Sequence, residues 1–205
     1  MAEIILQPVT DDREVLVQFT ESVTIAKDTK VIVPFGYFAA AYVDDQAEMF
    51  IRGGATITMC DEEDEELLNR QCKAAYIQEG PFDVLWGTEN PIQVNNSRLN
   101  ESYRVAARGN FLCMVADAEK LLKAFNGERV TVFDLKQKLR NLCGTVLAEG
   151  VGNYLSNSNT PSFRINAEKF AIGSSLDDML SSDATVREMG LRIYNCTVSM
   201  LDVRE

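Results

Sequence analysis

Five cysteines are the strongest nucleophiles in this 205-residue chain, and the chain contains no histidine to act as their base. Mechanisms that need an imidazole base or ligand are therefore excluded. No Cys-x-x-Cys pair occurs, so the sequence predicts neither a zinc site nor a redox motif. Buried, reduced thiols are the plain interpretation, and a thiol activated by a helix N-terminus or a nearby cation is the alternative. The five are Cys60, Cys72, Cys113, Cys143 and Cys196.

Six consecutive acids form the densest cluster of potential metal ligands in the sequence. A calcium loop spaces its ligands and needs a glycine for its turn, and this run has neither feature. The run therefore predicts a solvated loop or the start of a surface helix. It is also a candidate interaction surface for a basic partner. It consists of Asp61, Glu62, Glu63, Asp64, Glu65 and Glu66.

Other strings that would mark a reaction are missing from the sequence. There is no G-x-x-x-x-G-K-[ST] phosphate loop, no G-x-G-x-x-G after a strand, no G-x-S-x-G elbow and no H-E-x-x-H. The sequence thus predicts no catalytic residue, no metal and no cofactor. Acid pairs are plentiful in so acidic a chain, which leaves a two-carboxylate hydrolase open without positive support.

The charge balance narrows the classes of partner. Twenty Lys and Arg residues against 31 Asp and Glu residues give a net charge of −11. Nucleic acid and anionic lipid headgroups are disfavoured partners for such a chain. The N-terminus lacks the features of a secretion signal, and no stretch approaches the roughly 20 apolar residues of a membrane span. The sequence therefore predicts a cytoplasmic protein without direct membrane insertion.

The elements that must position any site change in kind along the chain. Residues 2–60 favour strands, including a hairpin of 37–43 with 47–51. Residues 73–116 favour a meander of short strands with a turn at 108–110. We expect residues 1–60 to form a β-rich part and residues 67–205 a strand-and-helix core. Residues 61–66 would join the two into one compact unit.

The second half favours helices. Asp117 can cap a short helix that ends at Phe125, and Thr131 with Asp134 resembles a capping box before a long helix. A further helix is expected over 167–180, and a closing strand over 191–203. The fold class is therefore α+β, with mainly antiparallel short strands followed by two main helices and a closing strand.

Several ordered strings resemble one known family. Val84-Leu85-Trp86-Gly87-Thr88-x-x-Pro91-Ile92 is followed by Arg104–Phe111, Val115-x-Asp117 and Met189–Ile193. Together these strings resemble the SPFH or band 7 superfamily of stomatin, prohibitin and flotillin. They are most similar to its soluble, virion-core-protein-like bacterial branch. The resemblance covers roughly residues 25–203.

The residues that carry this resemblance also have physical interpretations. Trp86 is expected to be a buried anchor, and a hot spot for a partner is the alternative. The glycines are expected to allow turn dihedrals, and proline fixes its own φ. The last glycine is expected to end a helix before the closing strand. The family turn and structural residues are Trp86, Gly87, Thr88, Pro91, Gly109 and Gly190.

The resemblance implies a non-enzymatic scaffold that assembles with copies of itself or with another protein. Family members pack side by side into rings or arrays, often at membranes, so indirect membrane association through a partner is expected. Members usually carry a membrane anchor before the domain or a coiled coil after it. We expect this sequence to be either a minimal member or one domain of a longer chain. Two alternatives stay open, a hydrolase that uses a cysteine or carboxylate and a phage or virion structural protein.

Overall fold

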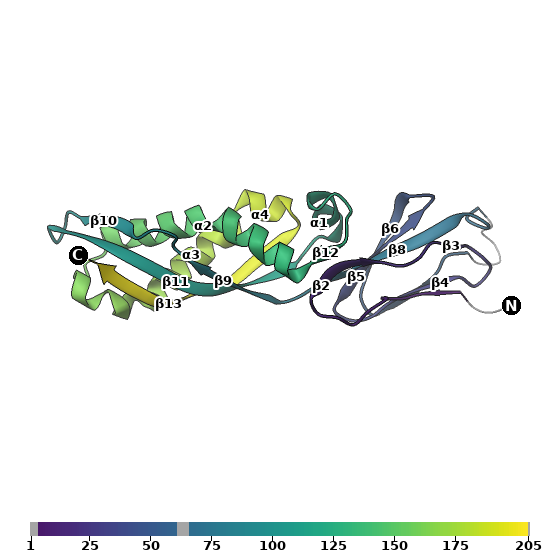
Figure 1. The fold of residues 1–205 in the computed structure, drawn as a ribbon, viewed down its shortest axis with the longest axis horizontal. Coiled ribbons are helices and arrows are strands. Elements are labelled where there is room, and N and C mark those ends of the chain that lie inside the picture. The colour runs from purple at the N-terminus through teal and green to yellow at the C-terminus, as the bar shows by residue number, and fades with distance from the viewer. Residues whose placement is uncertain (1–3, 61–65, 205) are drawn as a thin grey trace. The chain divides into compact units, whose positions relative to one another are not determined.

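A computed structural model describes residues 4–60 and 66–204, and its strands and helices form two compact units (Figure 1). Unit 1 takes in the chain up to Gly80 together with Val115–Leu135. Unit 2 consists of Pro81–Met114 and the chain from Lys136 onward. The fold is α+β with mainly antiparallel sheets, as the sequence predicts.

Unit 1 is built around two sheets that share one apolar core. One sheet has the order β1-β4-β7, and the other has the order β12-β2-β8-β5-β6, with β3 also pairing with β8. Alternate residues of β5 and β8 join residues of β4 in the core, as strand periodicity requires. The strands are β1 (Ile5–Leu6), β2 (Val15–Phe19), β3 (Val23–Thr24), β4 (Lys30–Val33), β5 (Tyr37–Val43), β6 (Gln46–Arg52), β7 (Ala55–Thr58), β8 (Gln71–Gln78) and β12 (Val130–Thr131).

The predicted hairpin is confirmed as β5 and β6. Asp44 and Asp45 link the strands with φ values of 48° and 65°, the left-handed pair that suits a two-residue hairpin. The Asp44 carboxylate accepts hydrogen bonds from Arg70 Nε at 2.7 Å and from the Gln71 backbone N–H at 3.1 Å. The Arg70 bond is the largest of the effects that lower the pKa of Asp44.

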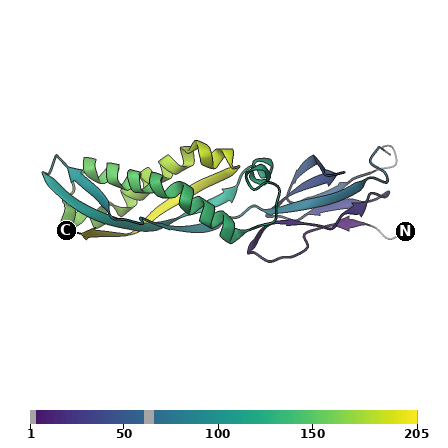
Figure 2. The same cartoon turned by 45° about the horizontal axis from the view of Figure 1, so that its top comes forward.

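Unit 2 contains a sheet centred on one long strand. β11 (Glu101–Val115) pairs with β9 (Phe82–Gly87) and β10 (Ile92–Asn96), and β13 (Leu191–Arg204) lies on its other side. Buried and more exposed residues alternate along β11, which is the pattern of a sheet with one covered face. Figure 2 shows the helices of unit 2 on one side of this sheet.

The expected turn at 108–110 is wrong, because β11 runs straight through it. Gly109 pairs with Trp86 in the regular β9–β11 register. Its φ is not positive, and a Cβ placed there would lie 1.9 Å from the backbone oxygen of Thr197. This glycine therefore allows a close approach of two strands, and the predicted turn dihedrals are not needed.

The first two helices begin where the sequence predicts, and the helix expected over 167–180 is observed as α3, which begins at Lys169. Asp117 accepts a hydrogen bond from the Lys120 N–H and caps α1 (Ala118–Ala124) in unit 1. The Thr131 hydroxyl accepts from the Asp134 N–H while the Asp134 carboxylate accepts from the Thr131 N–H, which caps α2 (Val132–Asn157). The remaining helices are η1 (Ser162–Glu168), α3 (Lys169–Ser182) and α4 (Ala184–Glu188).

Two predictions concern where elements and units of the chain end. Gly190 has a φ of 73° and separates α4 from β13, so the predicted helix stop before the closing strand is confirmed. The expected division at residues 61–66 stays a prediction, since residues 61–65 lie outside the described residues. Along the chain, the boundaries between the two compact units lie at Gly80/Pro81, Met114/Val115 and Leu135/Lys136.

Candidate interaction groove

The outer edge of β9 is the first wall of a groove in unit 2. Within the described residues, β9 pairs only with β11. The Leu85 carbonyl accepts a hydrogen bond from Arg140 Nε at 2.9 Å, so it points away from β11 and toward α2. Backbone groups of an antiparallel strand alternate in direction, and the Thr88 N–H donates inward to the Ala107 carbonyl. Leu85 and Gly87 therefore present their N–H groups at the open edge.

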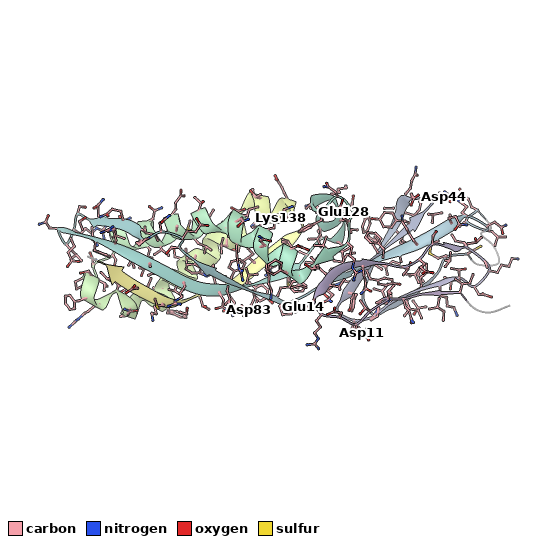
Figure 3. All side chains as sticks on the ribbon, viewed as in Figure 1. Asp11, Glu14, Asp44, Asp83, Glu128 and Lys138 are labelled. Atoms are coloured by element: carbon pink, nitrogen blue, oxygen red, sulfur yellow. The ribbon has the colours of Figure 1, made fainter. Side chains whose placement is uncertain are left out.

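Helix α2 forms the opposite wall. Gly152 lies beside Ile92, because a Cβ at Gly152 would be 3.1 Å from Cγ2 of that residue. Together with the contact between Arg140 and Leu85, this shows that α2 runs beside β9 and the turn after it in the same direction. Asp83 on β9 and Lys138 on α2 help to find the two walls (Figure 3).

The space between these walls is a groove of about 620 Å³. Its floor and rims come from residues 85–90 and from one face of α2. That face is made of small and polar side chains, with Arg140 at its beginning and Glu149 at its end. The helix residues that line the groove are Arg140, Asn141, Gly144, Thr145, Ala148 and Glu149.

Gly144 of α2 lines the groove beside open space. A Cβ built at Gly144 would meet no atom within 4 Å, and its φ is not positive. Neither internal packing nor backbone conformation therefore requires a glycine here. A glycine inside a helix is about 1 kcal/mol less favourable than alanine. Glycine at position 144 therefore makes α2 less stable than alanine would, and it leaves the groove open.

Comparison with known families places this groove in a shared domain. The sequence profile described as "SPFH domain-Band 7 family" matches residues 74–205, which is more than half of the chain. The chain belongs to the SPFH domain-Band 7 family. No curated protein shows significant similarity to it. Both walls of the groove lie inside the matched residues, so the groove is part of the SPFH domain.

Three of the residues expected to matter in the SPFH domain lie together at the groove. Trp86, Gly87 and Thr88 all line it. The Thr88 side-chain oxygen also accepts from the Ala107 N–H at 3.1 Å, which fastens the end of β9 to β11. Pro91 is half-buried in the turn that leads into β10. Gly109 and Gly190 are not among the lining residues, and their contributions are the close strand approach and the helix stop.

Trp86 is buried, with 7% of its surface exposed, as expected of an anchor. Its indole N–H has no hydrogen-bond partner of normal geometry among the described residues. The nearby indole nevertheless lowers the pKa of the Cys196 thiol, against the larger raising effect of burial. A thiol sulfur is a weak acceptor, so the indole and the thiol interact without forming a strong hydrogen bond. The expected role of Trp86 as a hot spot stays a prediction.

The acidic run contributes no described surface beyond its last residue. Asp61, Glu62, Glu63, Asp64 and Glu65 lie outside the described residues, and Glu66 is exposed in a turn of unit 1. The interaction role predicted for this run therefore remains untested. In the described residues, no group of three or more acidic or cysteine side chains is placed to hold a metal ion.

The buried thiols of this chain are poorly suited to nucleophilic chemistry. All five cysteines of the chain are buried, and none of them forms a disulfide. Burial raises the pKa of Cys113, Cys143 and Cys196 to about 12, and that of Cys72 to about 11. The thiolate is the reactive form, so these residues are essentially unreactive at neutral pH. The cysteine version of the hydrolase hypothesis loses its support.

Three carboxyl groups have pKa values shifted toward the charged form. Hydrogen bonds to hydroxyl, backbone or guanidinium donors lower the pKa of Asp44, Asp134 and Glu168. A general acid at neutral pH needs the opposite shift.

Among the described residues, no helix combines the length and apolar composition that crossing a bilayer requires.

Sequence reasoning missed the helix wall of the groove. Arg140 and Glu149 are ordinary surface charges of an amphipathic helix, and nothing in their spacing separates them from their neighbours. Gly144 is the one hint in the sequence, because an isolated glycine within a strong helical pattern usually has a packing or functional role. Its significance needs the structure, since only the structure shows that no packing explains it.

Proposed function

We propose that this chain is a non-enzymatic assembly module whose SPFH domain makes protein–protein contacts, with further copies of itself or with another protein. The observation that carries the proposal is its membership of the SPFH domain-Band 7 family over residues 74–205. Members of this family are generally non-enzymatic scaffolds that oligomerise and associate with membranes. The proposed function transfers that general role to this chain.

The chemistry of the described side chains supports the same role. The most buried thiols have raised pKa values, and the carboxyls with shifted pKa values are held in their charged form. An enzyme usually concentrates groups with pKa values tuned toward neutrality in one cleft. The groove beside β9 is instead lined by an open strand edge and small helix residues, which are features that suit another polypeptide.

Two finer proposals accompany this function. The strings around Trp86 and Gly190 support placement in the virion-core-protein-like branch, and any membrane association would then run through a partner protein. The cytoplasmic location predicted from the sequence belongs with them. A phage or virion structural role shares the assembly prediction, and the neighbouring genes would distinguish it from a cellular scaffold.

The solution mass tests the proposed function. Light scattering on a size-exclusion column should be recorded over about a hundredfold range of protein concentration, because association shifts with concentration by mass action. Self-assembly predicts discrete species above the 22.9 kDa of one chain, growing with concentration. A single 22.9 kDa species throughout would contradict self-assembly by this chain.

A further inference from the structure

We propose that the groove between β9 and α2 binds an extended segment of a partner protein, which adds as a new strand to the edge of β9 that faces away from β11. This inference deepens the proposed function and rests on it, because it names the surface and the kind of partner. The occupant to which the structure points is a peptide segment with an acidic residue near Arg140 and a basic residue near Glu89 and Glu149.

The strand edge dictates the backbone conformation of the occupant. Leu85 and Gly87 direct their backbone groups into the groove, and their N–H groups carry no hydrogen bond in the described part of the chain. An exposed edge of this kind is a template for an extended chain, which supplies carbonyls and N–H groups at the matching spacing. A helical occupant would satisfy its own backbone groups and leave the edge unpaired.

The side chains along the edge dictate what the occupant carries. Leu85 is 60% exposed although it is large and apolar, and cross-strand neighbours on one face of a sheet contact each other. The occupant should therefore place an apolar side chain beside Leu85. On the opposite wall, Gly144 and Ala148 leave room for the backbone or a second apolar side chain to approach α2 closely.

Charge gives the groove a direction. Arg140 lies beside Leu85, and among the described residues its guanidinium makes one hydrogen bond, through Nε to the Leu85 carbonyl, which leaves its Nη groups available for a carboxylate. Glu89 and Glu149 lie further along the two walls, which run in the same direction. Complementary charges at both ends would fix the register of the occupant and oppose the reversed orientation.

A second open edge in the molecule is less suited to the same role. In the part of the chain that the structure describes, strand β6 also pairs on one side only, with β5. Its register shifts where Ala41 faces Met49 and Tyr42 faces Ala47, which leaves Glu48 as a bulge. Bulges on edge strands disturb the regular spacing that another strand needs. The cavity beside β6 is also smaller, at about 270 Å³.

The test uses the full 205-residue chain and random peptides about ten residues long, which is longer than a typical strand. Phage displaying these peptides are selected on the wild-type chain after depletion on Gly144→Leu, whose side chain fills the groove. Enriched peptides are synthesised, and their affinities are measured by calorimetry. Asn153→Leu is the matched control, because it adds the same side chain to an exposed position of α2 outside the groove.

The proposal predicts enriched peptides that share an apolar centre with an acidic residue at one end and a basic residue at the other. Their affinity should fall by at least about tenfold in Gly144→Leu, a difference of about 1.4 kcal/mol, and stay unchanged in Asn153→Leu. Leucine is a better helix former than glycine, so a lost interaction cannot be attributed to a weakened helix.

Three results would overturn the proposal. They are the absence of any enriched peptide, equal affinity for both variants, and a solution mass that falls in Gly144→Leu, since the last result would make a second copy the occupant. The failure of the groove is distinguishable from the failure of the proposed function. Discrete oligomers that persist in Gly144→Leu, without peptide binding, would keep the assembly role and reject this groove.

Discussion

Two glycines in the SPFH domain, Gly109 and Gly144, have opposite surroundings. At Gly109, β11 lies so close to β13 that a Cβ would be 1.9 Å from the Thr197 oxygen and 3.0 Å from the Trp86 ring. At Gly144 a Cβ would meet nothing within 4 Å. The first glycine is required by the packing of the chain itself. The second leaves space that the described residues do not fill.

The difference separates a closed region from an open one within a single unit. The sheet around Gly109 is locked by backbone approach and by the buried Trp86, so its tolerance to change is low. The groove around Gly144 keeps polar groups, a strand edge and the exposed Leu85 available. We infer that the closed region maintains the fold and that the open region is where another chain makes contact.

The largest effect is expected for Gly109→Ala. The added methyl would overlap backbone atoms, which cannot rotate away as a flexible side chain can. We expect the free energy of unfolding to fall by about 3 kcal/mol, the upper part of the range for overpacking. Urea denaturation would measure the loss. Gly87→Ala is the control, because its Cβ would make only ordinary contacts at 3.6 Å. Equal stability of the two variants would contradict the claim that the packing around Gly109 requires a glycine.

A smaller effect of opposite sign is expected for Gly144→Ala. The methyl has free space, and alanine is favoured over glycine inside a helix by about 1 kcal/mol. The free energy of unfolding should therefore rise by about that amount in the same denaturation assay. A loss of stability would mean that the position is filled in the folded protein, and the groove would not be open as described.

The smallest effect concerns the C-terminal end of α2, where hydrogen bonds join the helix and the loop after it to Glu168. The Glu168 carboxylate accepts from the Tyr154 hydroxyl at 2.7 Å and from the Thr160 hydroxyl at 2.5 Å. These bonds, with that of Thr160 the larger influence, lower the pKa of Glu168 below its ordinary 4.5. The charged form therefore adds stability above pH 4.5, and this contribution disappears as the pH falls through the lowered pKa.

Glu168→Gln isolates that contribution, because glutamine keeps the shape and an accepting oxygen. The wild-type chain should be the more stable of the two near neutral pH, and the difference should shrink below pH 4.5. Urea midpoints measured across this range would show the narrowing gap. A difference that stays constant with pH would mean that the charge of Glu168 does not stabilise the C-terminal end of α2.

The sequence predicted the parts of this fold that depend on local chemistry. The Asp117 and Thr131 caps, the Asp44–Asp45 hairpin and the stop at Gly190 each follow from side chains that act within a few residues. The turn at Gly109 was predicted wrongly because glycine serves both turns and close strand approach. Only the distant Thr197 decides between them.

The candidate groove shows the same division. Trp86, Gly87 and Thr88 stand out in the sequence because they form a recognisable string. Arg140 and Glu149 do not, because their position opposite β9 results from tertiary packing of α2. The openness of Gly144 is likewise a property of the folded chain, so local patterns could raise a question about it but not answer it.

Amide hydrogen exchange along β9 tests the central claim most directly, because inward and outward N–H groups alternate within one strand. In the free chain, the account predicts slow exchange at Val84 and Trp86, which face β11, and fast exchange at Leu85 and Gly87. Addition of a selected peptide should slow exchange at Leu85 and Gly87. Slow exchange at all four positions in the free chain would contradict an open edge, and fast exchange at Leu85 and Gly87 in the complex would contradict strand addition.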